Sequence, residues 1–255
     1  MKQTKAQGHP ILFSLMLGIV LTFLVAAASA VATIMELGDR GIMIAQGCAF
    51  LMMAIIVTLY MNKKSRTWAS FGFIKPDPRK GKATLYYIPL LIIAVVQPIM
   101  GGFNLELTFM DVLIILIFSL LVGYTEESVF RGIIRERLQY KGKVFYIVFS
   151  ALFFGILHMA NALNGTGILH ILLQVINALL IGFILALLIE TTGNIIPLIA
   201  FHFLFDFLAQ LTSNAILDQE VLAVSILNIL YLCYGIYLVY GFINRKKTGS
   251  MNLQV

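Results

Sequence analysis

Long apolar runs separated by short polar connections dominate this sequence. A bilayer core about 30 Å thick takes about 20 helical residues to cross, and eight runs approach or exceed this length. They are residues 11–35, 41–61, 83–100, 109–125, 144–162, 168–190, 195–211 and 221–243. The pattern predicts an all-α fold: a polytopic helical bundle of about eight transmembrane helices, forming one transmembrane domain over residues 1–255.

The composition supports this interpretation and excludes several classes of protein. Hydrophobic residues make up 60% of the chain and charged residues only 12%, against about 25% charged residues in soluble domains. Soluble α/β enzymes, nucleic-acid-binding proteins and disordered regulators are therefore excluded, and the lipid bilayer is the expected surrounding. Cys48 and Cys233 lie inside apolar runs without a Cys-x-x-Cys pattern, which predicts buried, reduced packing residues.

The distribution of lysine and arginine predicts the orientation. With eight spans, 17 of the 18 basic residues fall on one side, and only Arg40 falls on the other. Basic residues concentrate in cytoplasmic connections of membrane proteins. Both termini and the connection over residues 62–82 are therefore predicted to be cytoplasmic, in a multi-pass protein of the cell membrane.

A few ionisable residues interrupt the apolar spans. Such residues are rare inside a membrane and are candidates for a functional site. The candidates are Glu126 and Glu127 at the end of the fourth span, His158 in the fifth, and His202 and Asp206 in the seventh. His170, which opens the sixth span, is interpreted as an interfacial residue.

The spacing of these residues predicts how they pair. Glu127 and Arg131 stand at i and i+4, which favours an ion pair along one helix, whereas Glu126 has no such partner and requires a proton, a metal or a histidine. An alternative is that both glutamates and Arg131 are solvated charges at the headgroup boundary. His202 and Asp206 are also at i and i+4 and share one helix face, which must look into the protein or a watery cavity.

A third polar element comes from the fifth span, where Phe154 precedes His158 by one helical turn. A glutamate and two histidines on three separate spans can activate a water molecule. They can do so as a general base with hydrogen-bonding groups or as ligands of a metal such as zinc.

These elements resemble the three motifs of the CAAX-protease and bacteriocin-processing (Abi) family of intramembrane endopeptidases. The family pattern is Glu-Glu-x-x-x-Arg, then Phe-x-x-x-His, then His-x-x-x-Asn or Asp. The chain supplies Glu126 to Arg131, Phe154 to His158 and His202 to Asp206 in the same order. The motif-bearing core spans residues 109–211.

The resemblance implies an endopeptidase that hydrolyses a membrane-associated or precursor peptide in a bacterial plasma membrane. Glu126 and His158 would activate the water, and His202 with Asp206 would support the oxyanion. The site would be held by Glu127, Arg131 and Phe154. If zinc were bound, its ligands would be Glu126, His158 and His202; the metal-independent mechanism is preferred.

An alternative function is that of a non-catalytic transport, immunity or scaffold protein whose Glu/His/Asp cluster binds a proton or an ion. The predicted helix boundaries also contain a conflict. With a membrane surface at Arg131, Glu126 is about 8 Å deep, whereas His158 is about 22 Å beyond Lys143. Three explanations are open: the segment after Arg131 dips into the membrane, the fifth helix is strongly tilted, or the boundary is wrong.

Overall fold

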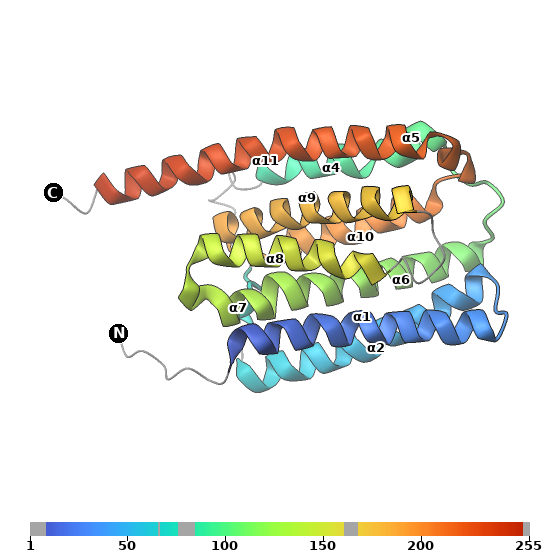
Figure 1. The fold of residues 1–255 in the computed structure, drawn as a ribbon, viewed down its shortest axis with the longest axis horizontal. Helices are drawn as coiled ribbons and strands as arrows, with labels where there is room; N and C mark the ends of the chain where they lie inside the picture. The colour runs from blue at the N-terminus through green and yellow to red at the C-terminus, as the bar shows by residue number, and fades with distance from the viewer. Residues whose placement is uncertain (1–8, 66, 76–84, 161–167, 252–255) are drawn as a thin grey trace.

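A computed structural model describes residues 9–65, 67–75, 85–160 and 168–251. In these residues the chain is almost entirely helical, with helices that run back and forth along one axis (Figure 1). The main helices are α1 (Pro10–Ile34), α2 (Asp39–Lys64), α4 (Ile88–Ala94), α5 (Val96–Gly101), α6 (Phe109–Glu127), α8 (Lys143–Leu157), α9 (Ile168–Thr192), α10 (Ile196–Leu211) and α11 (Glu220–Met251). The predicted all-α helical bundle is confirmed.

Six helices in the described part of the chain are long and apolar enough to cross a membrane. They are Pro10–Ile34, Asp39–Lys64, Phe109–Lys141, Lys143–Ala160, Ile168–Thr192 and Asn214–Asn244. The third and seventh predicted spans form shorter apolar helices, Leu85–Gly101 and Ile196–Leu211. The chain is therefore a multi-pass membrane protein in which every predicted span has a helical counterpart, two of them short.

The predicted end of the fourth span at Thr125 is wrong. The helix continues beyond α6 through a π-helix (Ser128–Ile134), α7 (Arg135–Leu138) and a 3₁₀ turn (Gln139–Lys141). The chain reverses at Gly142, whose φ of 94° suits glycine. Glu126 lies 16 residues before Gly142 and His158 lies 16 residues after it, which places both about 24 Å from the turn. The conflict in depth therefore disappears.

The predicted end of the fourth span was wrong because the arginines after Glu127 were interpreted as part of a basic cytoplasmic loop. In the structure Arg131 is fully buried, and Arg135 Nε lies 2.6 Å from a carboxylate oxygen of Glu190 on α9. Arg137 Nε donates to the hydroxyl of Tyr60 over 2.8 Å. Because each of these arginines has a polar partner inside the bundle, the helix can continue through them. They therefore should not be counted among the basic residues of the cytoplasmic connections from which the orientation was predicted.

The two ends of the bundle differ in charge. Lys63 and Lys64 end α2, while Lys141 and Lys143 flank the turn before α8; we call this the lysine end. The opposite, acidic end carries Glu36, Asp39, Glu106, Asp111, Asp218 and Glu220. Helix α1 begins and α11 ends at the lysine end (Figure 1), as the predicted location of both termini on one side requires. Of the other basic residues counted, Lys2, Lys5, Arg66, Arg79, Lys80 and Lys82 lie outside the described residues.

The described part of the connection after α2 packs into the lysine end. Phe71 is buried, with its ring 6.4 Å from that of Tyr60. The carbonyl of Gly72 accepts a hydrogen bond from the backbone N–H of Ile195 over 2.9 Å. This contact fixes the start of α10, the helix that carries His202.

Both cysteines are exposed, so the prediction that they are buried is wrong. The outer face of a membrane helix contacts lipid and is as apolar as its packed face. Apolar neighbours in the sequence therefore do not reveal burial in this class of protein.

Exposed cysteines make the orientation testable. In a chain with Cys48→Ser and Cys233→Ser, we expect Lys75→Cys, an exposed position, to react with a membrane-impermeant maleimide only after the cytoplasmic face is opened. The control is Glu106→Cys at the acidic end, which should react in intact cells. Labelling of position 75 in intact cells would reverse the orientation.

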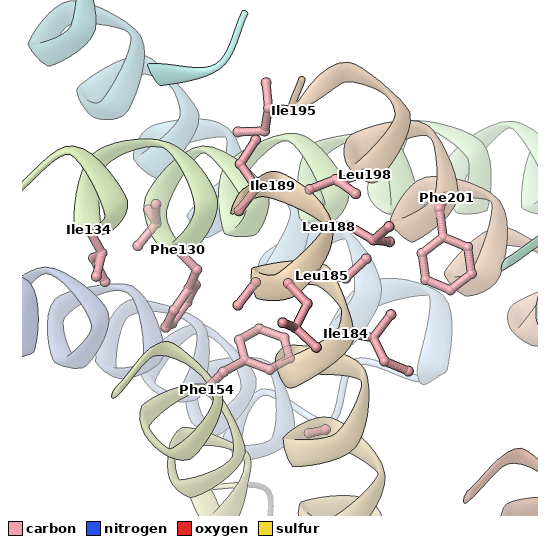
Figure 2. Packing of buried hydrophobic residues seen from close by; sticks show 14 of the residues in the cluster. Phe130, Ile134, Phe154, Ile184, Leu185, Leu188, Ile189, Ile195, Leu198 and Phe201 are labelled. Atoms are coloured by element: carbon pink, nitrogen blue, oxygen red, sulfur yellow. The ribbon is translucent and has the colours of Figure 1, made fainter. Parts of the chain in front are cut away.

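Helix α9 forms the centre of the core. Its residues Ile184 to Ile189 are all buried, and Figure 2 shows Leu185 and Leu188 among Phe154 of α8 and Phe201 of α10. Helices α6 and α10 approach each other closely at Gly123. A Cβ atom at this position would lie only 2.9 Å from the backbone nitrogen of Phe203, so only glycine allows this contact. This contact holds α6 against α10 beside the candidate residues.

Candidate active site

A buried chain of polar side chains joins three helices. Glu127 ends α6, and its Oε1 accepts hydrogen bonds from His202 Nδ1 over 2.9 Å and from an Arg131 terminal nitrogen over 3.1 Å. The other terminal nitrogen of Arg131 donates to the carbonyl of Gly182 on α9 over 3.1 Å. Glu127 and Arg131 are fully buried, so the alternative of a solvated pair at the headgroups is wrong.

The two consecutive glutamates flank the two nitrogens of one imidazole ring. Glu127 occupies the Nδ1 side of His202, while Glu126 Oε2 lies 3.8 Å from Nε2. Asp206 Oδ2 lies 3.5 Å from the same Nε2. The histidine that Glu126 approaches is therefore His202, and the predicted shared face of His202 and Asp206 brings both side chains to Glu126.

His158 stands at the end of α8 with one nitrogen committed to the backbone. Its Nδ1 lies 2.8 Å from the carbonyl oxygen of Phe154. Because a carbonyl only accepts, Nδ1 carries the proton, and Nε2 of the neutral ring is an acceptor. His158 is thus oriented by its own helix and keeps one basic nitrogen available.

Phe154 lies among the polar groups of all three helices. Its ring is 4.7 Å from the ring of His158 and 6.4 Å from the ring of His202. The guanidinium carbon of Arg131 lies 4.7 Å from the centre of the same ring, within range for a cation–π interaction. Phe154 therefore fills the space between the two histidines and the buried arginine.

A cavity of about 430 Å³ opens beside these residues; we call it the central cavity. Glu126, His158 and Asp206 line it together, near the middle of the continuous helix Phe109–Lys141. Toward the acidic end it is lined by Gln210 and His170.

His170 lies at the end of this cavity, in contact with Glu220. Its Nδ1 is 2.6 Å from a carboxylate oxygen of Glu220. This partly exposed pair at the acidic end agrees with the interpretation of His170 as interfacial.

A smaller cavity of about 170 Å³ adjoins the first; we call it the side cavity. It is lined by His158, His202 and Asp206. Within the described ranges, no hydrogen bond or ion pair joins Glu126 to His158 directly; the two side chains face the central cavity instead. The cavity beside Glu126 and His158 therefore leaves space for a reacting water molecule and a peptide carbonyl.

The geometry does not fit the predicted zinc set of Glu126, His158 and His202. Nowhere in the described ranges do three or more His, Cys, Asp or Glu side chains form a group that could hold a metal ion. We therefore derive no chemical step through a metal.

Sequence reasoning missed two features of the site. The π-helix Ser128–Ile134 begins directly after Glu127, and π-helical turns are frequent at functional sites; no pattern in the sequence indicated it. Gln174 and Asn177 of α9 line the side cavity. Their spacing of three residues within an apolar helix was a signal that could have identified them.

Comparison with known protein families gives a match to part of the chain. Residues 108–208 match the family model described as type II CAAX prenyl endopeptidase Rce1-like. These residues are similar to that family, and we call them the Rce1-like segment. The match begins at the residue that caps α6 and ends within α10, so the Rce1-like segment contains all three motifs. The resemblance to the CAAX-protease family is confirmed there, and searches of curated proteins and of solved structures gave no match.

Proposed function

We propose that this protein is an intramembrane endopeptidase that hydrolyses a peptide bond in a membrane-associated peptide. The observation that carries this proposal is the central cavity, where Glu126, His158 and Asp206 meet at mid-helix depth. The Rce1-like match supports the same class of reaction and a CAAX-type substrate. The position in a bacterial plasma membrane is part of the proposal.

The proposed reaction begins with a water molecule between Glu126 and His158. The water donates one proton to the carboxylate of Glu126 and its other hydrogen bond to Nε2 of His158, while its oxygen attacks the carbonyl carbon. A general base of this kind supplies typically 10²–10⁴-fold in rate. The carbon–nitrogen bond then breaks, the proton held by Glu126 passes to the leaving amine, and the products are a carboxylic acid and an amine.

Glu127, Arg131 and Phe154 act in this proposal as positioning residues. Glu127 and Arg131 fix the rotation of the His202 ring through the hydrogen bond to Nδ1, so that Nε2 points toward Glu126 and Asp206. When this ring carries a proton on both nitrogens, which the carboxylates of Glu126 and Asp206 beside Nε2 favour, it can present an Nε2–H to the developing oxyanion. Preorganised donors of this kind are worth most where water is excluded. Asp206 orients the ring from the other side.

An assay of the purified protein in lipid nanodiscs tests the proposed function. Peptides that end in Cys-aliphatic-aliphatic-X, with and without a prenyl group, are incubated with wild type and with Glu126→Ala, and products are identified by mass spectrometry. We expect cleavage by wild type only.

The same preparations separate the endopeptidase from the ion-binding alternative. An endopeptidase without a metal keeps its activity after chelation, and its zinc content is equal in wild type, His158→Ala and His202→Ala. Absence of proteolysis in every variant, with proton or ion uptake that depends on Glu126, would replace the endopeptidase by the ion-binding function.

A further inference from the structure

We propose that Gln174 is a catalytic residue whose side-chain amide donates a hydrogen bond to the oxyanion of the tetrahedral intermediate. This inference rests on the proposed endopeptidase function and adds a group from α9. None of the three motifs contains this residue.

The position of Gln174 sets it apart from the other amide side chains of the cavities. It lines both the central and the side cavity, and only Phe154, His158 and Asp206 share this position among the described residues. A group located where the two cavities meet can reach a carbonyl that is attacked from the side of Glu126 and His158. The substrate carbonyl would therefore lie between the proposed base and Gln174.

The amide of Gln174 is also free to act. It makes no hydrogen bond or other polar contact with any described residue, although its neighbours Leu173 and Val175 are apolar. Asn177, the other amide in the side cavity, already donates to Asn228 Oδ1 over 3.3 Å. Gln210 is exposed and lines only the central cavity. Of these three amides, Gln174 alone combines a free donor with contact to both cavities.

The chemistry of Asp206 creates the need for such a donor. An ionised carboxylate only accepts hydrogen bonds, and a developing negative charge beside it is repelled. Asp206 Oδ2 is directed at His202 Nε2 over 3.5 Å, which suits an orienting role. A neutral amide can donate to the oxyanion without adding another negative charge.

In the proposed step, the carbonyl oxygen gains negative charge as the water oxygen bonds to the carbonyl carbon. The Gln174 Nε2–H strengthens its hydrogen bond to that oxygen, and no proton is transferred. When the carbon–nitrogen bond breaks, the electron pair on the oxygen reforms the double bond. The amide thus acts mainly in the transition state, and its loss should lower kcat more than it raises KM.

The test measures kcat and KM for a peptide that wild type cleaves and Glu126→Ala does not. Gln174→Met removes the amide from a chain of similar length, and Gln174→Glu replaces the donor by an acceptor. Both should lower kcat by about 10²–10³-fold, the effect of losing one oxyanion donor, with KM within about threefold of wild type. Gln219→Met, which changes an exposed glutamine outside both cavities, is the matched control and should keep the wild-type kcat.

A comparison of kcat between two variants of Gln174 distinguishes hydrogen-bond donation from a purely structural role. Gln174→Asn restores a neutral amide donor on a shorter chain and should have a kcat at least tenfold higher than Gln174→Met, although methionine matches glutamine better in length. Equal kcat values of these two variants would overturn the proposed donor role. A kcat of Gln174→Met or Gln174→Glu within threefold of wild type would overturn the role of Gln174 while the endopeptidase stands. Absence of cleavage by wild type would instead refute both the endopeptidase and this inference.

Discussion

Replacing any one of Glu126, His158 and His202 by alanine is expected to lower kcat for peptide cleavage by about 10³-fold or more. Each change removes a group beside the reacting water or the oxyanion, and general acid–base groups alone contribute about 10²–10⁴-fold. The protein should still accumulate in the membrane, because each change leaves the Glu127–Arg131 pair intact. The measurement is kcat in nanodiscs, with membrane levels determined by immunoblot.

Two further variants make this expectation specific. Glu126→Gln keeps the shape of the side chain and removes the base, so it should be as inactive as Glu126→Ala. Glu106→Gln changes an exposed glutamate at the acidic end and should leave kcat unchanged. An alanine variant of any of the three residues with a kcat within tenfold of wild type would remove that residue from the site.

Loss of either partner of the buried ion pair is expected to impair folding as well as catalysis. Glu127→Ala leaves the fully buried guanidinium of Arg131 without its carboxylate, and Arg131→Ala leaves the carboxylate without its guanidinium. Removing one member of a buried pair costs about 3–5 kcal/mol. We expect strongly reduced membrane levels and a lower midpoint of thermal unfolding, measured on the purified variants.

The chain offers a matched control for this effect. Arg40 and Asp111 form an ion pair of 2.7 Å in which the arginine side chain is 54% exposed; such pairs contribute about 0–1 kcal/mol. Arg40→Ala should therefore leave membrane levels near those of wild type. The double variant Glu127→Leu/Arg131→Met should accumulate better than either single alanine variant, because it leaves no unpaired buried charge. Normal levels of both single variants would contradict a desolvated pair.

Much of the fold follows from the sequence because the bilayer imposes a simple rule on it. Each apolar run long enough to span must form a helix to satisfy its backbone hydrogen bonds, so the eight runs identified the helices. The i, i+4 spacing likewise predicted the Glu127–Arg131 pair and the shared face of His202 and Asp206, since helix geometry alone determines both.

The parts that the sequence did not reveal depend on contacts between distant segments. Arg135 can extend the helix after Glu127 because Glu190, 55 residues away, neutralises it. Local sequence shows only a cluster of charges there, so it indicated a loop and placed Glu126 near the surface. The spacing of Gln174 and Asn177 marks a polar face of α9, but the position of Gln174 at two cavities depends on how α9 packs against α8 and α11.

The double variant Glu126→Ala/His158→Ala tests most directly whether one water is activated by both groups. Its kcat is compared with those of the two single variants in the same nanodisc preparation. If Glu126 and His158 act on one water, the double variant should be less than about tenfold slower than the slower single variant, because groups that act as a unit are strongly non-additive. Losses that multiply would show that the two residues act independently, and would contradict a shared water between Glu126 and His158.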